Sequence, residues 1–298
     1  MKPAPFTYHR PQSVDDVFGI FDSVGDVDDV KVIAGGQSLI PLMALRLAQP
    51  GHLIDLNGLA AELDSIEPAA GVVRIGALTR QRVAERSRAV ALRCPLLAEA
   101  LTYVAHPAIR NRGTVGGSLA HADPAAELPA VALALDAELT VRGRDGARQI
   151  PASDFFQSLM TTAIGPDEIL QSIDFPVLPT GSGTAFVEVS RRHGDFAMVG
   201  AAAAVTVADG EITDARLALS GVADTPVRAC AVENALRGER ADAGSLRDAA
   251  ALAADGIDPP ADPHASSSYR RHVATVTAAR ALLLAVDRAT REAADGTH

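Results

Sequence analysis

Two pairs of adjacent glycines constrain this sequence most. They lie in the segments Ala34–Ser38 (Ala-Gly-Gly-Gln-Ser) and Thr114–Ser118 (Thr-Val-Gly-Gly-Ser), named here the first and second diglycine loops. A glycine pair has no Cβ atoms to keep other groups away, and it reaches positive φ at little cost. Successive backbone N–H groups can then point into one concavity and bind an anion without a cationic side chain. We therefore predict two tight turns that present bare N–H groups to an anion. For either turn alone, a structural turn without a ligand is the simpler interpretation.

Together, the two loops would suit a diphosphate gripped from both sides. The first loop follows an apolar, β-branched run, Val30–Ala34, which predicts a strand leading into a glycine turn. Its spacing does not fit the Gly-x-Gly-x-x-Gly fingerprint of a Rossmann fold, and no long helix follows. A Walker A loop is also excluded, because the sequence contains no Gly-Lys-Ser/Thr.

The charge balance limits the possible partners. The chain has 298 residues, 27 of them basic and 37 acidic, and a formal net charge of -10. Nucleic acids and anionic membranes call for clustered lysines and arginines, so neither is expected as the main partner. An anion would have to be held locally, by backbone dipoles or by single arginines.

Cysteine usage and the chain start predict a reduced, cytoplasmic setting. Cys94 and Cys230 are the only cysteines and stand far apart, so no Cys-x-x-Cys pair could ligate zinc or an iron–sulfur cluster. The first residues lack the apolar segment of a signal peptide, and no run is long enough to span a bilayer. We therefore expect a cytoplasmic protein without a membrane span.

The first third of the chain predicts a small mixed unit. Ser13 and Asp16 form a capping box before apolar residues spaced as on a helix, from Val14 to Phe21. The order that follows is a strand, the first diglycine loop, a short helix over 39–47 and a strand over 52–56.

The middle of the chain predicts a second mixed unit. The expected elements are a strand at 72–75, helices at 81–89 and 95–104, a loop at 108–123, a helix at 128–135, and strands at 138–142 and 169–175. Pro107 disfavours helix at the residue before it, so the chain leaves the helix there. A stretch rich in proline and glycine, 176–183, predicts a domain boundary.

The last part predicts an antiparallel sheet followed by helices. Strands are expected at 184–190, 198–207 and 213–219, and helices at 228–236, 245–253 and 269–286, with 241–265 partly loop and a frayed tail at 296–298. Helices gathered after a small sheet indicate an α+β module.

The segment Ile109–Glu127, which contains the second diglycine loop, closely resembles the FAD-binding medium subunit of the molybdenum hydroxylases, the carbon monoxide dehydrogenase and xanthine dehydrogenase family. The stretch Ala34–Met43 resembles the other hallmark of that family. Further similarity lies in Ile75–Arg80, Arg191–Ala197 and Tyr269–Arg271. The resemblance therefore covers nearly the whole chain, in order.

The resemblance implies an α+β fold of the vanillyl-alcohol oxidase type. Two subdomains, 1–57 and 58–177, would clasp an extended FAD, and a C-terminal domain with a small antiparallel sheet and helices, 178–290, would cover the flavin end; 291–298 would be a tail. Both diglycine loops would meet at the FAD pyrophosphate. This agrees with the backbone argument, because two separate anion sites suit a dinucleotide better than FMN.

The resemblance also implies which residues contact FAD. The expected residues are Ile33, Ala34, Gly35, Gly36, Gln37, Ser38, Leu39, Ile109, Thr114, Val115, Gly116, Gly117, Ser118, Asp123, Glu127 and Phe196. The hydroxyls of Ser38, Thr114 and Ser118 would donate to phosphate oxygens, with turn stabilisation as the alternative.

Four of these residues would contact other parts of FAD. Asp123 and Glu127 would accept from ribityl or ribose hydroxyls, or else complement a helix N-terminus. The family usually has aspartate at the position of Glu127. Phe196 matches the family position beside the isoalloxazine ring, with a core aromatic as the alternative, and Ile109 could pack on the same ring.

No metal site is expected. His121 with Asp123, and His193 with Asp195, each pair a histidine with a carboxylate, but neither pair has a third ligand at a recognisable spacing. Arg110 and Arg112 are interpreted as shaping the second diglycine loop, with phosphate neutralisation as the alternative.

The resemblance implies an FAD-binding electron-transfer subunit with no catalytic residue of its own. Its partners would be a large molybdopterin-binding subunit and a small [2Fe-2S] subunit, with two copies of each of the three subunits, and the final acceptor would be a quinone, NAD⁺ or oxygen. A free-standing FAD-dependent oxidoreductase would need an acid–base pair near the loops, and none is evident in the sequence. A flavin-free structural subunit is the other alternative, which the intact glycine pairs disfavour.

Overall fold

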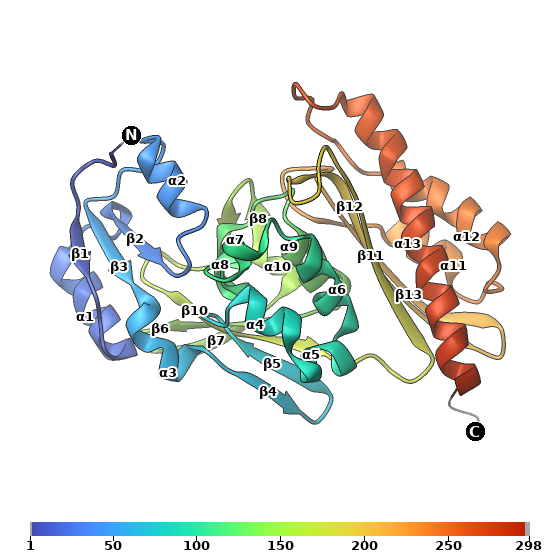
Figure 1. The fold of residues 1–298 in the computed structure, drawn as a ribbon, viewed down its shortest axis with the longest axis horizontal. Helices are drawn as coiled ribbons and strands as arrows, with labels where there is room; N and C mark the ends of the chain where they lie inside the picture. Colours follow the sequence, from blue (N-terminus) through green and yellow to red (C-terminus); the bar gives the residue numbers. More distant parts are fainter. Residues whose placement is uncertain (1, 296–298) are drawn as a thin grey trace.

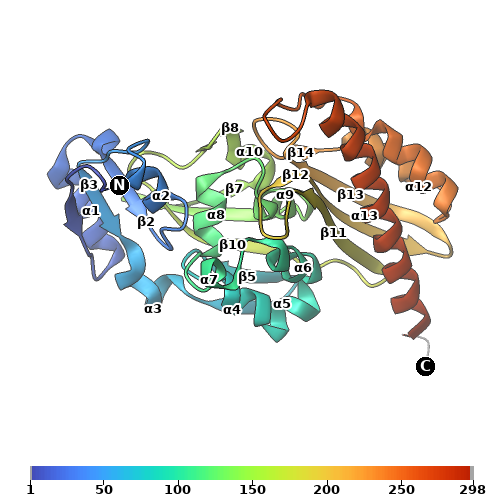
Figure 2. The same cartoon turned by 45° about the horizontal axis from the view of Figure 1, so that its top comes forward.

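A computed structural model describes residues 2–295 of the chain. The chain builds three sheets in succession along an elongated body, with the N-terminus at one end and the longest helix at the other (Figure 1). The view in Figure 2 shows the same order, with helices α4 to α9 gathered on the middle sheet. This arrangement agrees with the predicted mixture of helices and strands.

The first unit is a three-stranded parallel sheet with helix α1 against it. Strands β1 (Thr7–His9), β2 (Val30–Ile33) and β3 (His52–Asp55) pair in the order β1-β3-β2. Helix α1 (Val14–Val24) begins at the predicted capping box: Ser13 Oγ accepts from Asp16 N at 3.1 Å, and the Asp16 carboxylate accepts from Ser13 N at 3.0 Å. The helix ends at Gly25, whose φ of 75° is the left-handed conformation that glycine adopts without strain.

Short helices complete this unit. They are η1 (Val27–Asp29), α2 (Leu39–Ala44), η2 (Leu56–Leu59) and α3 (Ala60–Leu63). The predicted order of strand, glycine loop, short helix and strand is confirmed. Helix α2 ends three residues before the predicted end, where Arg46 takes a φ of 59°.

The second unit is a five-stranded antiparallel sheet. Its strands, in the order β4-β5-β10-β6-β7, are β4 (Ile66–Ala69), β5 (Val72–Gly76), β10 (Ile169–Pro176), β6 (Glu138–Gly143) and β7 (Gly146–Pro151). A small hairpin, β8 (Phe156–Ser158) with β9 (Thr161–Thr162), stands apart. On β5, Val73 and Ile75 are buried beneath helices while Arg74 points to the opposite, polar face, the alternation expected of a sheet covered on one side.

Seven helices of the described chain belong to this unit. They are α4 (Gln81–Arg86), α5 (Arg88–Arg93), α6 (Pro95–Tyr103), α7 (Pro107–Arg110), α8 (Val115–His121), α9 (Glu127–Ala134) and α10 (Ala152–Phe155). Every residue of α9 is buried, so this helix is the centre of the core. The predicted helix over 81–89 is divided at Ser87, whose hydroxyl caps α5.

The predicted loop over 108–123 is wrong, because this segment contains α7 and α8. Helix α8 includes both glycines of the second diglycine loop, and Thr114 caps it by accepting from Gly117 N at 3.0 Å. Glycine is a poor helix former, which favoured a loop in the sequence. Packing decides otherwise: a Cβ on Gly116 would lie 2.5 Å from Ala77 Cβ, so the helix can lie this close only with glycine there.

The third unit is an antiparallel sheet covered by helices. Strands β11 (Ser182–Ser190), β12 (Ala197–Ala208), β13 (Glu211–Ser220) and β14 (Val227–Arg228) pair in that order. Helices α11 (Cys230–Leu236), α12 (Ala243–Ala250), η3 (Ala251–Ala254) and α13 (Ser267–Asp295) follow. The predicted helices are confirmed with shifted ends, and α13 runs nine residues beyond its predicted end at 286. The expected frayed tail, 296–298, lies outside the described residues.

The third sheet separates two apolar cores. Ala201 and Ala203 on β12 belong to the core beneath α13, whereas Ala202 belongs to the core of the second unit, together with Phe186 on β11. A sheet with both faces buried explains why β12 is a continuous apolar run rather than an alternating one. The C-terminal unit therefore packs directly on helices α6 and α9 of the second unit.

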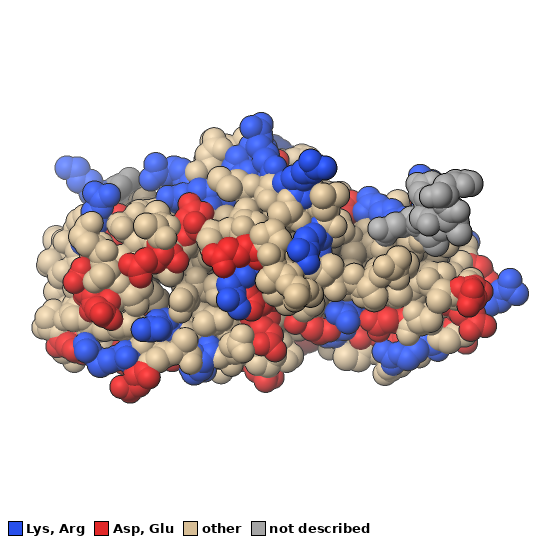
Figure 3. All heavy atoms as spheres, turned by 90° about the horizontal axis from the view of Figure 1, so that it is seen from below, with Lys and Arg blue, Asp and Glu red and all other residues tan. Residues whose placement is uncertain are grey.

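The surface shows charges of both signs. On the face in Figure 3, acidic and basic side chains are interspersed, and uncharged atoms lie between them. Within residues 2–295, no helix combines the length and apolar character needed to cross a membrane.

Candidate functional site

The first diglycine loop connects β2 to α2 and holds a run of unused donors. Gly36 has a φ of 70°, as predicted for a glycine turn. Across the described residues, none of the five backbone amides from Gly35 to Leu39 donates a hydrogen bond, and the next amide, that of Ile40, donates to Gly36 O at 3.1 Å. The side chain of Ser38 precedes α2 but does not cap it. Consecutive N–H groups left free in this way form a site suited to an anion.

Four of the five amides of the second diglycine loop are paired within the chain, so the prediction of a run of bare amides is wrong for this loop. The amides from Val115 to Ser118 donate in turn to Thr79 O (2.9 Å), Ala77 O (3.0 Å), Thr114 Oγ1 (3.0 Å) and Thr114 O (3.2 Å). These bonds tie the start of α8 to the strand end after β5. The glycines of this loop serve close packing, and the Ser118 hydroxyl has no partner within the described part of the chain.

The structure brings the two loops into contact. A Cβ on Gly35 would lie 2.3 Å from Arg112 O and 2.8 Å from Gly113 Cα, so the first loop touches the backbone that leads into the second. A Cβ on Gly117 would lie 3.7 Å from Ala34 Cβ. Segments about 80 residues apart in the sequence therefore form one site, as the resemblance implies.

Two polar residues that the sequence analysis did not assign to the site connect these loops. Asn57 follows β3 and donates from Nδ2 to Ala34 O at 2.8 Å. Arg80 directly precedes α4 and donates from Nη2 to Asn57 Oδ1 at 2.5 Å and from Nη1 to Arg112 O. The sequence held a signal for each: Asn57 directly follows the predicted strand at 52–56, and Arg80 ends the stretch Ile75–Arg80, which is part of the family resemblance.

The flanks of the first loop are held by packing and one amide bond. A Cβ on Gly36 would lie 3.1 Å from side-chain carbons of both Ile33 and Ile40, so these two residues close the apolar underside. Gln37 donates from Nε2 to Gly35 O at 3.0 Å. Leu39 begins α2 and is half-buried. These contacts hold the loop conformation and leave its amides free.

A buried acidic group lies at the far side of the second loop. Asp123 accepts from Ala125 N at 2.9 Å and so shapes the turn into α9, which Glu127 begins. Glu127 is only 4% exposed, and this burial raises its pKa to about 7, with the Asp123 carboxylate acting in the same direction. Glu188, on β11, is close enough to sense its charge: burial and then the charge of Glu127 raise the pKa of Glu188 to about 8. The sequence analysis missed Glu188, which carries no motif.

The two apolar residues expected beside a flavin lie at the surface. Phe196, in the turn between β11 and β12, is 60% exposed, so the alternative that it is a core aromatic is wrong. Ile109, on α7, is half-buried. Exposed apolar rings of this kind are available to a planar ligand.

The arginines and histidines near the second loop mostly have structural roles. Arg110 is 5% exposed and donates to Glu85 at 2.8 Å and to the carbonyls of Val104 and Ala105, so its hydrogen bonds hold the chain between α6 and α7. The ring of His193 stacks on Tyr103, with centroids 6.4 Å apart. In the described part of the chain, no group of three side chains could hold a metal ion.

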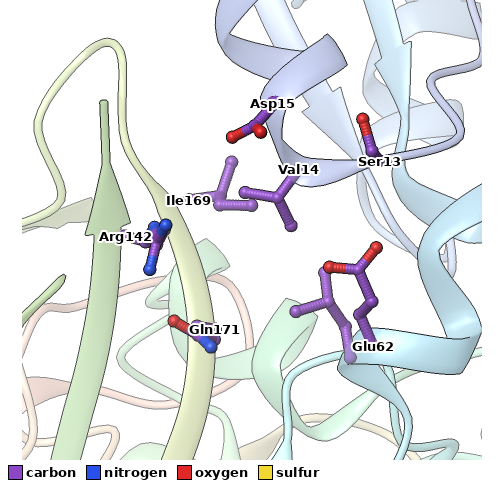
Figure 4. Close-up of a pocket in the computed structure, with 8 residues that line it drawn as sticks. Ser13, Val14, Asp15, Glu62, Arg142, Ile169 and Gln171 are labelled. Atoms are coloured by element: carbon purple, nitrogen blue, oxygen red, sulfur yellow. The ribbon is translucent and has the colours of Figure 1, made fainter. Parts of the chain in front are cut away.

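A separate polar cavity of about 230 Å³ lies between the first and second units (Figure 4). The figure shows Arg142 and Gln171 on the sheet side facing Asp15 and Glu62 on the helix side. A larger hollow, of about 600 Å³, continues over the polar face of the same sheet. Neither cavity is lined by a predicted site residue, so the two loops form a site distinct from both.

Two protein families match nearly all of the chain. Residues 4–178 match the family described as the FAD binding domain in molybdopterin dehydrogenase, and residues 184–285 match the CO dehydrogenase flavoprotein C-terminal domain.

Individual relatives agree with these matches. The chain is 42% identical over 298 residues to the 6-hydroxypseudooxynicotine dehydrogenase complex subunit alpha of Paenarthrobacter nicotinovorans, covering 99% of this chain and 100% of that one. It is 38% identical to the carbon monoxide dehydrogenase medium chain of Afipia carboxidovorans, covering 97% and 99%. Among solved structures, carbon monoxide dehydrogenase from Hydrogenophaga pseudoflava superposes with a TM-score of 0.93 at 38% identity, covering 97% of this chain and 99% of that chain.

Proposed function

The chain belongs to the family of FAD-binding proteins of the molybdopterin dehydrogenases, and from this premise we propose that it is the FAD-carrying medium subunit of a molybdenum hydroxylase complex. FAD is the cofactor of the family, and the chain is an oxidoreductase subunit. When bound, FAD supplies a redox centre that takes up two electrons and can release them together or singly.

The run of free amides in the first diglycine loop is the observation that supports our assignment of the diphosphate site. Five consecutive donors, from Gly35 to Leu39, remain unpaired at the point where the two loops touch. Leaving backbone donors without acceptors is costly unless water or a ligand pairs them. We assign the FAD diphosphate to these amides, with the hydroxyls of Ser38 and Ser118 as further donors. The second loop then acts as the opposite wall, through its packing rather than its amides.

The other assigned residues orient the rest of FAD. Glu127 is buried with a raised pKa, so its carboxyl group is suited to hydrogen bonds with ribityl or ribose hydroxyls. Ile109 and the exposed ring of Phe196 supply apolar surface for the isoalloxazine ring. All these residues bind and orient the cofactor, and none needs to act as a nucleophile or metal ligand.

The proposed complex supplies the centres that this chain lacks. Two [2Fe–2S] clusters need about eight ligands, mostly cysteines. This chain has two cysteines: Cys94 is buried, which raises its pKa to about 12, and Cys230 is exposed. We therefore propose that a small subunit carries the clusters and passes electrons to this subunit, that a large subunit carries the molybdopterin centre, and that two copies of each subunit assemble.

The same proposal extends to the domains. The family resemblance supports a vanillyl-alcohol oxidase type of fold, with FAD-binding subdomains at 1–57 and 58–177 and a C-terminal domain at 178–290. The three sheets are consistent with this division, since each segment contains one of them.

Binding and reduction of FAD by the isolated chain test the proposal. We expect the purified chain to bind one FAD and the bound FAD to stay oxidised when aldehydes, N-heterocycles or carbon monoxide are added. Reduction should require the co-purified small and large subunits. A chain that stays colourless after incubation with FAD would overturn the proposal in favour of a structural subunit, and rapid reduction by a small substrate would favour a free-standing oxidoreductase.

A further inference from the structure

One guanidinium group connects both diglycine loops. Arg80 Nη1 donates to Arg112 O, the carbonyl that touches Gly35, and Arg80 Nη2 donates to Asn57 Oδ1 at 2.5 Å. Asn57 in turn donates to Ala34 O at 2.8 Å. The Arg80–Asn57 pair therefore bonds to the backbone of Ala34, at the start of the first loop, and of Arg112, two residues before the second loop.

Hydrogen bonds to the Asp55 carboxylate fix the orientation of the Asn57 side chain. Asp55 Oδ1 accepts from Asn57 N at 2.9 Å and from Asn57 Nδ2 at 2.5 Å, while Asp55 Oδ2 accepts from the Tyr8 hydroxyl at 2.6 Å. These hydrogen bonds outweigh burial and keep the pKa of Asp55 below its usual value. With Nδ2 directed at acceptors, Oδ1 of Asn57 must face the donor, Arg80. The donors and acceptors of Tyr8, Asp55, Asn57 and Arg80 can therefore be paired in only one way.

The charge of Arg80 is not paired with a carboxylate. In the described part of the chain, no carboxylate lies within 4.0 Å of its guanidinium, whereas the neighbouring Arg82 and Arg110 both pair with Glu85. Its guanidinium donates to a neutral carbonyl and a neutral amide. In a protein with a net charge of -10, an unneutralised guanidinium beside five free amides favours an anion there.

We propose that Arg80 and Asn57 are positioning residues for the cofactor: their hydrogen bonds hold the two diglycine loops at the spacing that the FAD diphosphate requires, and Arg80 adds the local positive charge. This inference rests on the proposed function for the identity of the ligand. It assigns a role to two residues that neither the glycine motifs nor the cavities reveal. No bond is made or broken in this role.

The test measures FAD and ADP affinity for four purified variants of the full chain. Arg80→Ala removes both the hydrogen bonds and the charge, Asn57→Ala removes the bridge to Ala34 but keeps the charge, and Arg80→Lys keeps the charge but cannot donate in the same forked geometry. The matched control is Arg93→Ala, because Arg93 on α5 also donates to a backbone carbonyl, Ala69 O, at 2.7 Å, away from the loops. ADP serves as a probe that carries a diphosphate and lacks the flavin.

We expect Arg80→Ala to raise the dissociation constants of FAD and ADP by about 10- to 100-fold, the loss that corresponds to about one hydrogen bond of a charged group. Asn57→Ala and Arg80→Lys should give intermediate losses, and Arg93→Ala should bind like the wild type. The loss in Arg80→Ala should shrink at high salt, while the loss in Asn57→Ala should not, because only the first removes a charge.

The outcomes separate this inference from the proposed function. If the wild type binds neither FAD nor ADP, the proposed function fails. If the wild type binds both and the Arg80 and Asn57 variants bind equally well, the positioning role is wrong and the proposed function stands. If Arg80→Ala lowers the melting temperature of the apoprotein more than Arg93→Ala does, its loss of FAD affinity could come from partial unfolding. The FAD affinity of Asn57→Ala relative to the wild type then tests the positioning role: a weaker affinity supports it, and an equal affinity contradicts it. A change in the visible circular dichroism of bound FAD would support altered positioning, which a purely structural role would not produce.

Discussion

Replacement of Gly35 by alanine tests whether contact between the two diglycine loops is what makes the site. The added Cβ would lie 2.3 Å from Arg112 O, and the nearest neighbours are backbone atoms that cannot rotate away. To reach the 3.4 Å at which ordinary contact begins, the loops must separate by 1.1 Å, the difference between the two distances. Overpacking of this kind costs about 1–3 kcal/mol of folding stability.

The matched control is Gly19→Ala in helix α1. A Cβ on Gly19 would meet nothing within 4 Å, and alanine favours a helix interior over glycine by about 1 kcal/mol. The same chemical change should therefore stabilise the protein at one site and destabilise it at the other. Urea unfolding monitored by circular dichroism would measure both effects.

Cofactor binding gives the second measurement for Gly35→Ala. A separation of 1.1 Å moves the free amides relative to the opposite wall, so at least one charge-assisted hydrogen bond to the diphosphate should be lost. We expect the FAD dissociation constant to rise by about tenfold or more. Wild-type FAD affinity and wild-type stability in Gly35→Ala would refute the view that contact between the loops is required, whereas Gly19→Ala should bind FAD normally.

Three further predictions concern single side chains. Thr114→Ala should cost about 1 kcal/mol of stability in urea unfolding, because the cap of α8 is lost, and Thr114→Ser should cost much less. The pKa of Glu127 rises on folding from an ordinary 4.5 to about 7, so the folded state holds the proton more tightly than the unfolded state. The free energy of unfolding should therefore fall as pH rises from about 4.5 to about 7. Glu127→Gln should remove that part of the pH dependence, and an unchanged pH dependence would contradict the burial argument. A thiol reagent should label Cys230 quickly and Cys94 only after unfolding, since Cys94 is 2% exposed and its pKa is about 12; fast modification of both thiols in the native protein would show that α6 is not packed as described.

Local patterns predicted most of the regular elements because short-range chemistry determines them. The capping box at Ser13 predicted the start of α1, and the alternation of glycine loop and apolar runs predicted β2, α2 and β3 in order. Strands β1, β4, β7 and β14 and the hairpin β8–β9 were missed. Their residues are largely exposed or irregular, so they lack the apolar alternation that marks a strand.

The second diglycine loop shows where local patterns mislead. Two adjacent glycines predict a turn with positive φ, yet Gly116 and Gly117 are helical, because Ala77 packs against the position a Cβ would occupy and Thr114 caps the helix. Both facts depend on β5 and its following turn lying beside α8. The same glycines were therefore identified correctly as important, with the wrong physical reason.

By itself, the sequence determined the chemistry that this protein can carry: two glycine pairs able to bring backbone close to a partner, too few cysteines for iron–sulfur clusters, and a charge balance that leaves anion binding to local groups. Only the tertiary structure decided which amides stay free, because that depends on whether an acceptor elsewhere in the chain reaches them. It left the first loop unpaired and satisfied the second from Ala77 and Thr79. It also joined the two loops through Arg80 and Asn57, whose hydrogen bonds connect segments that no local pattern relates.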